Sequence, residues 1–139
     1  MTREEVATFF AKRQLHWNAR DPDRLAADHA ADGIVQSPMH GQRHGREAIR
    51  ASYAALFEAF PDWKFTSDDL IIDGDRVIQV FTADATHVGE FMGMMGSNRR
   101  FRIQGVRQCE MRDGAIQTER RLYDFTGLLI QVGVLKPKT

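Results

Sequence analysis

The feature of this sequence that most constrains its fold is a change in hydrophobic period near Trp63. Before this residue, apolar side chains recur every three or four positions, which is typical of amphipathic helices. After it they alternate, and two Asp-Gly pairs, Asp73-Gly74 and Asp113-Gly114, separate the alternating runs. Asp-Gly between alternating runs is a strong signal for a tight β-hairpin turn. The sequence therefore predicts helices followed by an antiparallel meander.

The caps of the first two helices are visible in the sequence. Thr2 followed by Glu5 forms a capping box, so we expect a helix over residues 3–18. Asp21 caps a second helix, and Pro22 occupies its first position, where a missing N–H costs nothing. Both helices begin with residues that satisfy the free backbone N–H groups of a first turn.

The remaining element boundaries follow from Gly and Pro residues that interrupt helices and from the hydrophobic period. The second helix is expected to run to Asp32-Gly33 and to be followed by a short strand at 34–35. A Gly-rich loop at 39–45 leads to a third helix that Pro61 ends. Beyond it, the alternating runs predict strands at 63–72, 76–87, 99–111 and 115–124.

Helices gathered at one end of a mainly antiparallel sheet define an α+β fold. Because sheets twist, a strongly curved sheet would wrap the three N-terminal helices into a cone with an apolar interior open at one end. Such an interior suits a small ligand. No linker divides residues 1–139, so we expect one domain.

Composition argues against several classes of partner. The 19 Lys and Arg residues balance the 19 Asp and Glu residues, and no basic run could neutralise a phosphate backbone, so nucleic acid is not an expected partner. No apolar run approaches the roughly 18 residues that a membrane helix requires. We therefore expect a cytoplasmic protein without a membrane partner. The single cysteine, Cys109, lies in an alternating run and is expected to be a small buried hydrophobe.

Asp124 is the leading candidate for chemistry. Alternate side chains of a strand share a face, so Asp124 would share one with Ile116, Thr118, Arg120 and Leu122. A carboxylate in an apolar pocket loses hydration and can then exchange a proton near neutral pH. In the alternative interpretation, Asp124 ends the strand and caps the backbone N–H of Gly127 or Leu128.

Two charged residues near Asp124 leave alternatives open. Arg120 lies about 13 Å away at roughly 3.3 Å per residue, and it either binds a substrate carboxylate or enolate or only neutralises a buried acid. Glu110 lies on the partner strand. A strict two-residue turn would place it on the face opposite Asp124, whereas a one-residue bulge would place it on the same face.

Histidines supply further candidates. His87 ends an alternating run and either polarises a carbonyl or relays a proton at a pocket mouth, or is a buried structural histidine. His40 and His44 are four residues apart, but Gly41 and Gly45 indicate a loop, and no third ligand is near in sequence. No metal site is therefore predicted.

Several apolar residues are candidate ligand contacts. Phe91 and Met92 belong to a Met-rich loop broken by glycines, and such a loop suits a lid over a hydrophobic ligand. A dimer contact or core filling would explain the loop as well. Trp17 and Tyr53 lie on helices and either line the cavity or pack in the core.

Three segments together resemble a known family. Residues 60–63 read Phe-Pro-Asp-Trp, and residues 86–93 read Thr-His-Val-Gly-Glu-Phe-Met-Gly. Residues 113–133 combine Asp-Gly-x-Ile, then Asp124, then Gly-Leu-Leu-x-Gln-x-Gly. This combination resembles the SnoaL-like polyketide cyclases over nearly the whole chain.

The resemblance implies a nuclear transport factor 2-like cone and a homodimer built sheet to sheet. It implies that Asp124 is the acid/base of an intramolecular aldol condensation that needs no cofactor. It places His87 in the pocket. It also allows the loop with His40 to close over a ligand, although a solvated loop is the favoured interpretation of His40. Thr118 and Arg120 stand where the family usually has Glu and Trp. Thr118 and Leu122 are expected to contact the ligand.

Two classes of function follow. The first is a cofactor-independent enzyme that acts on a small, mostly apolar carbonyl compound or polyketide-like ligand, with Asp124 moving the proton and His87 or Arg120 stabilising the oxyanion. Isomerisation and epoxide hydrolysis, as in relatives of the same superfamily, fit the same residues. The second is a non-catalytic carrier or interaction domain in which Arg120 and Asp124 form a structural pair.

Overall fold

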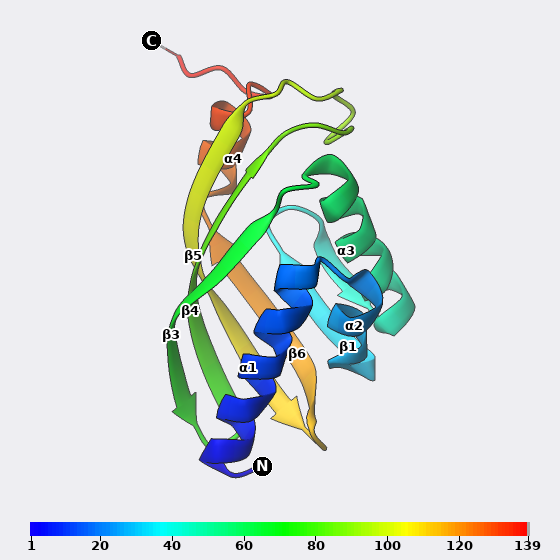
Figure 1. Ribbon diagram of the computed structural model, residues 1–139, viewed down its shortest axis with the longest axis vertical. Helices are drawn as coiled ribbons and strands as arrows, with labels where there is room; N and C mark the ends of the chain where they lie inside the picture. Colours follow the sequence, from blue (N-terminus) through cyan, green and yellow to red (C-terminus); the bar gives the residue numbers. More distant parts are fainter. Residues whose placement is uncertain (139) are drawn as a thin grey trace.

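The computed structural model describes residues 1–138 and shows an α+β arrangement (Figure 1). Its helices are α1 (Arg3–Ala19), α2 (Pro22–Ala27), α3 (Arg46–Ala59) and α4 (Phe125–Gln131). Its strands are β1 (His29–Ser37), β2 (Gly41–His44), β3 (Lys64–Asp73), β4 (Arg76–Thr86), β5 (Arg100–Arg112) and β6 (Ala115–Tyr123). The predicted fold class is confirmed.

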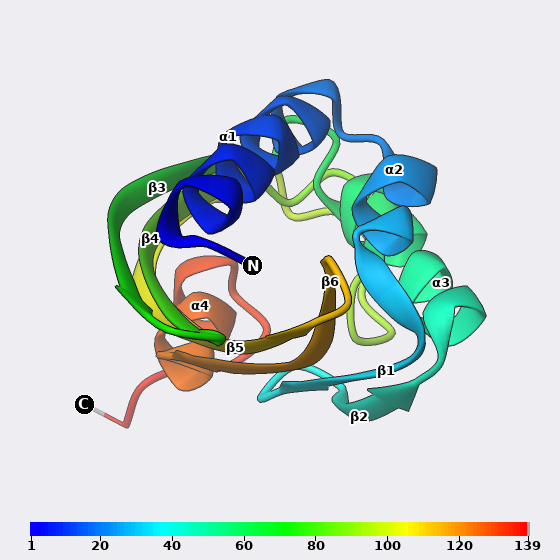
Figure 2. The ribbon, with the colours of Figure 1, turned by 90° about the horizontal axis from the view of Figure 1, so that it is seen from below.

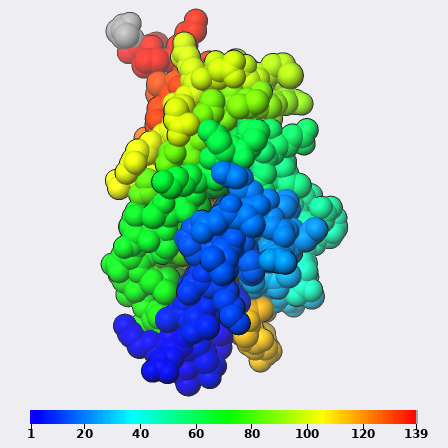
Figure 3. All heavy atoms as spheres, viewed as in Figure 1, coloured from blue at the N-terminus to red at the C-terminus, as the bar shows by residue number. Residues whose placement is uncertain are grey.

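The six strands form one sheet in the order β2-β1-β6-β5-β4-β3. Neighbouring strands are antiparallel except β1 and β6, which are parallel. The sheet curves strongly, with α1 across its open side near β3 and the α2–α3 pair beside β1 (Figure 2). In the space-filling view, atoms of the N-terminal helices cover the sheet behind them (Figure 3). The interior of the curve is therefore enclosed by helices.

Local capping explains where the first helices begin. The Thr2 hydroxyl accepts the Glu5 N–H at 3.1 Å, and the Asp21 carboxylate accepts the N–H groups of Asp23 and Arg24 at 3.1 and 3.2 Å. Arg20, at φ 48°, ends α1 in the left-handed conformation. These starts agree with the sequence prediction because caps depend on neighbouring residues alone.

The predicted end of the second helix is wrong. The helix stops at Ala27, and the chain enters β1 at His29 instead of continuing to Asp32-Gly33. The Asp28 carbonyl accepts the N–H of Ile116 at 2.9 Å, which begins the pairing with β6. The predicted loop at 39–45 likewise contains β2, which pairs with β1. Contacts remote in sequence override the local pattern in both segments.

A β-bulge in β6 sets which side chains enter the interior. Arg112 pairs with Ala115 across a turn in which Asp113 and Gly114 both have positive φ, as the tightest hairpins require. Glu110 then pairs with Thr118, and Gln117 is the extra residue. An inserted residue moves every following side chain to the other face. Glu119, Arg121 and Tyr123 therefore point inward.

The main core fills the curve of the sheet and is rich in aromatic rings. Trp17 of α1 stacks on Phe65 of β3 with ring centroids 4.5 Å apart, and Phe65 stacks on Phe81 at 5.2 Å. Leu128 and Leu129 of α4 join this core from the far end of the sheet. The sequence analysis did not predict α4.

Candidate functional site

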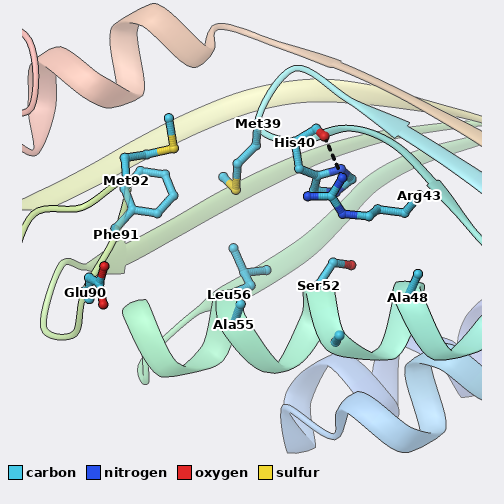
Figure 4. Close-up of a pocket in the computed structure, with 11 residues that line it drawn as sticks. Met39, His40, Arg43, Ala48, Ser52, Ala55, Leu56, Glu90, Phe91 and Met92 are labelled. Atoms are coloured by element: carbon cyan, nitrogen blue, oxygen red, sulfur yellow. Dashed lines mark hydrogen bonds between the residues drawn. The ribbon is translucent and has the colours of Figure 1, made fainter.

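A mainly apolar groove of about 510 Å³ lies between α3 and two loops (Figure 4). We call it the outer groove. One wall is α3, and the other walls are the loop between β1 and β2 and the Met-rich loop after β4. Its lining residues are Met39, His40, Arg43, Ala48, Ala51, Ser52, Ala55, Leu56, Glu90, Phe91 and Met92. The predicted positions of His40, Phe91 and Met92 at a ligand-sized cavity agree with this geometry.

His40 is a groove residue that can accept a proton. Its Nδ1–H can donate to the Gly41 carbonyl at 3.0 Å, which leaves a lone pair on Nε2. Nε2 is buried and has no hydrogen-bond partner among the described residues. Burial, followed by the charges of Arg121 and Arg43, lowers the pKa of His40 to about 4. The imidazole is therefore neutral at pH 7.

A second, narrow cavity of about 20 Å³ lies deeper in the molecule. We call it the inner cavity. Its lining residues are Ser37, Met39, Leu56, Trp63, Phe81, Ile103, Arg107, Arg121 and Tyr123. Met39 and Leu56 line both cavities, so these two side chains separate the outer groove from the inner cavity.

Beside the inner cavity, Arg13, Arg107 and Arg121 surround Glu119, and we call these four residues the arginine cluster. The Arg121 Nε donates to Glu119 at 2.6 Å, whereas Arg107 and Arg13 approach the same carboxylate at 3.7 and 3.9 Å. Burial alone would raise the pKa of Glu119, but the surrounding cations hold it well below its usual range. Glu119 is therefore ionised and acts as a counterion.

Tyr53 connects this cluster to His29. The Tyr53 hydroxyl accepts from Arg13 Nη2 at 2.6 Å and from Arg121 Nη2 at 3.1 Å. The hydroxyl lies 2.9 Å from Nε2 of His29, to which it can donate its own hydrogen. Burial, followed by the charge of Arg13, lowers the pKa of His29 to about 3, so this imidazole is a neutral acceptor.

Trp17 and Tyr53, which were predicted as ligand contacts or core residues, lie in the core. Each is 1% exposed, and neither lines the outer groove or the inner cavity. Trp17 supports Arg107 from one face, and Tyr53 binds two guanidinium groups. The core alternative is the one that the structure shows.

The predicted strand face differs in the structure: the bulge at Gln117 turns Thr118, Arg120 and Leu122 outward, away from Ile116, and β6 ends at Tyr123, before Asp124. Arg120 and Leu122 are exposed on the outer sheet face, and Thr118 lies on the same side opposite Glu110. Glu110 is exposed as well. The alternative with a one-residue bulge is therefore the one that the structure shows, and Glu110 lies on the outer face with Thr118. Arg120, Leu122 and Thr118 therefore do not line the interior as expected.

Asp124 lies in solvent at the beginning of α4, not in an apolar pocket. Its carboxylate accepts the Gly127 N–H at 2.8 Å, which is the capping contact that the sequence analysis gave as the alternative. No contact joins it to Arg120 in the described chain. Its predicted proton transfer stays a prediction, without the buried environment on which it was based.

His87 is fully buried behind the Met-rich loop. Its Nδ1 accepts the Ser97 N–H at 3.3 Å and lies 3.1 Å from the Ser97 hydroxyl, which places the ring proton on Nε2. The ring packs against Phe60 and Phe91 at centroid distances of 5.8 and 6.0 Å. His87 therefore supports Phe91 but does not line the outer groove.

The sequence analysis missed the arginine cluster, although one signal was present. Arg107 alternates with apolar residues along β5, in phase with Cys109 and Met111, and thus lies on the buried face. Arg13 occupies the buried side of α1 with Phe10 and Trp17. A charged residue in phase with an apolar stripe indicates a buried ion that requires partners. Cys109 is buried as predicted, and burial raises the pKa of its thiol.

Two absences can be stated for residues 1–138. No three His, Cys, Asp or Glu side chains converge in a way that could hold a metal ion. No helix in this part of the chain has the length and apolar character needed to cross a bilayer.

Comparisons with known proteins indicate one family. The profile of the SnoaL-like polyketide cyclase family matches residues 6–132. The chain is similar to TsrD from Streptomyces laurentii, with 25% identity, a TM-score of 0.85, and coverage of 97% of this chain and 99% of TsrD. It is also similar to IdmH, a proposed polyketide cyclase from Streptomyces antibioticus, with 26% identity, a TM-score of 0.76, and coverage of 91% and 97%.

The fold recurs in more distant structures. A protein from Catenulispora acidiphila with a ketosteroid isomerase-like fold has 20% identity and a TM-score of 0.77, with coverage of 99% of this chain and 100% of that protein. A search among curated proteins gave no match.

Proposed function

Because the chain belongs to the SnoaL-like polyketide cyclase family, we propose that it is a cofactor-independent acid/base enzyme that acts on a small, mostly apolar carbonyl compound. The observation that carries the proposal is His40, a groove-lining residue with a neutral imidazole whose buried Nε2 has no hydrogen-bond partner among the described residues. The proposal moves the proton-transfer role from Asp124 to His40.

The proposed reaction begins with enolisation. Nε2 of His40 removes a proton from the carbon next to the substrate carbonyl, and the C–H electron pair becomes the enolate. The enolate oxygen would lie toward Arg121, whose charge already acts on His40 and which lines the inner cavity. A fixed cation beside a developing oxyanion lowers the barrier because it needs no reorganisation.

For an aldol cyclisation, the enolate carbon then bonds to a second carbonyl carbon of the same substrate. The electron pair of that second carbonyl moves to its oxygen, and the imidazolium of His40 returns the proton to the resulting alkoxide. Apolar side chains of Met39, Leu56 and Phe91 line the groove, so they would hold the substrate and limit access of water. No step needs an oxidant or a metal.

A hydrogen–deuterium exchange experiment tests the proton transfer without knowledge of the natural substrate. With 4-phenylbutan-2-one in D₂O, we expect the protein to accelerate exchange next to the carbonyl, followed by proton NMR. His40→Gln should lower the rate about 10²- to 10⁴-fold, the usual contribution of a general base. The rate should be level above about pH 5 and fall as the pH drops through about 4, because protonation removes the base.

Two variants separate the hypotheses. His44→Gln is the matched control, since His44 is exposed on the same hairpin and binds Gln42 at 3.1 Å. Asp124→Asn tests the sequence-based hypothesis directly. A rate lost in Asp124→Asn and retained in His40→Gln would return the role to Asp124. Absence of any acceleration by the unmodified protein would contradict the enzymatic proposal.

One observation favours a non-catalytic binding protein as the second candidate. The inner cavity of about 20 Å³ is too small for a substrate group, since it compares with the space of about one water molecule. A ligand confined to the outer groove would be held by apolar walls without reaching Arg121. Binding of 4-phenylbutan-2-one without exchange would support this candidate.

The outer face of the sheet supports a further part of the proposal, a homodimer built sheet to sheet. Val80, Val106 and Leu122 are registered neighbours on three adjacent strands, and each retains exposed surface. Contiguous apolar side chains on an exposed sheet face are typical of an interface. Residence in the cytoplasm stays a prediction.

A further inference from the structure

Arg107 is a buried cation whose hydrogen-bonding capacity is not used. It lies on the inner face of β5, directly opposite Arg121 of β6, and is 3% exposed. Its Nε and Nη1 are both buried and have no hydrogen-bond partner among residues 1–138. Burial and the charge of Arg121 lower its pKa to about 10, so the guanidinium remains charged at neutral pH. Unpaired buried donors on a charged group are strongly destabilising.

The carboxylates of the interior form hydrogen bonds with other arginines. Arg13 binds Asp28 at 3.0 Å, and Arg121 binds Glu119 at 2.6 Å. The Nη1 of Arg107 lies 3.7 Å from Oε2 of Glu119, the oxygen that Arg121 already binds, and this distance is too long for a hydrogen bond. The interior therefore holds one guanidinium without a carboxylate of its own.

Aromatic rings hold this guanidinium in place without satisfying its donors. The central carbon of Arg107 lies 4.6 Å from the ring centroid of Trp17, 4.7 Å from that of Phe65 and 5.1 Å from that of Phe81. Cation–π contacts use ring faces, whereas guanidinium N–H groups point outward in their own plane. The aromatic rings fix the position of Arg107, and its N–H groups remain available.

Arg107 lines the inner cavity together with Arg121 and Tyr123. The Tyr123 hydroxyl lies 3.0 Å from the hydroxyl of Ser37, which belongs to the neighbouring strand β1. The polar groups of the lining residues are thus two guanidinium groups, two hydroxyl groups and the indole N–H of Trp63, which has no partner among the described residues, with no carboxylate. This is the donor set that binds an organic anion.

We propose that the inner cavity receives the carboxylate of an organic acid, held by Arg107 and Arg121, while the apolar body of the ligand occupies the outer groove. This proposal specifies the chemical class of the ligand at the site described under the proposed function. It depends on that function only because the ligand occupies the same outer groove. A carboxylate needs more room than the present cavity offers. Met39 and Leu56, which separate the two cavities, must turn aside to admit it.

The competing explanation is that Arg107 is purely structural and that a water molecule satisfies its donors. The inner cavity is large enough for about one water. This explanation predicts that a ligand with a carboxylate and a neutral ligand of the same shape bind equally well. The two explanations therefore differ in a measurable preference.

Isothermal titration calorimetry with 4-phenylbutanoate and 4-phenylbutanamide tests the proposal. We expect the carboxylate to bind about 10- to 100-fold more tightly, as hydrogen bonds between charged groups typically provide. Arg107→Leu should abolish this preference. Arg120→Leu is the matched control, because it removes the same charge from the outer face of the same sheet and should leave the preference unchanged.

A second measurement uses the unmodified protein and does not depend on the folding of a variant. The Nε–H resonance of Arg107, assigned by through-bond NMR, should shift on addition of 4-phenylbutanoate and not on addition of the amide. Equal affinity for acid and amide, a preference that survives in Arg107→Leu, or an unshifted resonance would each overturn the proposal. If the protein prefers the acid but does not accelerate hydrogen–deuterium exchange, the proposed catalysis is overturned and the proposed carboxylate site is retained.

Discussion

At the scale of single residues, burial decides the protonation states on which the site depends. His29 and His40 are both neutral histidines, but they differ in their partners. The acceptor atom of His29 is used by Tyr53, whereas Nε2 of His40 has no partner among the described residues, and the His40 side chain belongs to a groove. The same chemical group is therefore structural in one position and available for chemistry in the other.

The low pKa of His29 predicts acid sensitivity. Its folded-state pKa of about 3 lies below the ordinary value of 6.5, so between these values the unfolded chain binds the proton more readily. The free energy of unfolding should therefore fall as the pH drops below 6.5, by about 2 kcal/mol at pH 5. Urea denaturation at pH 7 and pH 5 measures it.

His29→Gln keeps an acceptor for Tyr53 but cannot titrate, so we expect it to reduce this loss between pH 7 and pH 5. His44→Gln, at an exposed position, should show the same loss as the unmodified protein. An equal loss in His29→Gln would show that the pH dependence originates elsewhere.

At the scale of elements, one extra residue in β6 determines the composition of the interior. The bulge at Gln117 directs Glu119 and Arg121 inward and leaves Arg120 exposed. Downstream, β6 ends at Tyr123 and Asp124 begins α4. Gln131 near the end of α4 binds both backbone groups of Arg102, at 2.8 and 3.2 Å, which ties the helix to β5.

The capping role of Asp124 predicts a stability effect that depends on the substituent. Asp124→Ala removes the acceptor for the Gly127 N–H and should lower the free energy of unfolding by about 1 kcal/mol. Asp124→Asn should be nearly neutral, since Asn caps as well as Asp. Urea denaturation compares the two variants. Thr126→Ala, at an exposed position in the same turn, is the control, and equal stability of all three variants would contradict the cap.

At the scale of the whole molecule, the curved sheet has two faces with different uses. Its inner face carries Arg107, Arg121 and Glu119 and faces the aromatic core, and its outer face carries exposed apolar side chains on β6 and on the edge strand β3. Leu122 is 48% exposed and Ile71 is 53% exposed. An outer face of this kind is expected to be covered in an assembly.

The proposed homodimer predicts a change in molecular mass after one substitution. The unmodified protein should have the mass of two chains by size-exclusion chromatography with light scattering. Val106→Arg places an unpaired charge at the centre of the proposed interface and should give the mass of one chain, because burying that charge is costly. Lys12→Glu on the exposed side of α1 is the control. A monomeric unmodified protein would contradict the dimer.

The sequence by itself determined the features that depend on neighbouring residues. The caps at Thr2 and Asp21, the end of α3 before Pro61 and the turn at Asp113-Gly114 follow from local hydrogen bonds and backbone preferences. The first hairpin turn lies one residue later than predicted, at Gly74-Asp75, because Asp73 pairs with Arg76. Phe91, Met92 and His40 line a groove, which was one of the alternatives open from the sequence, and their contact with a ligand stays a prediction.

The tertiary structure alone decided which charged residues face the interior. Strand phase after Gln117 depends on the pairing of β6 with both β1 and β5, and a shift of one residue exchanges the two faces. Arg13, Arg107 and Glu119 are stable inside only as a group assembled from α1, β5 and β6. A buried charge requires partners that are distant in sequence, and local patterns do not record them.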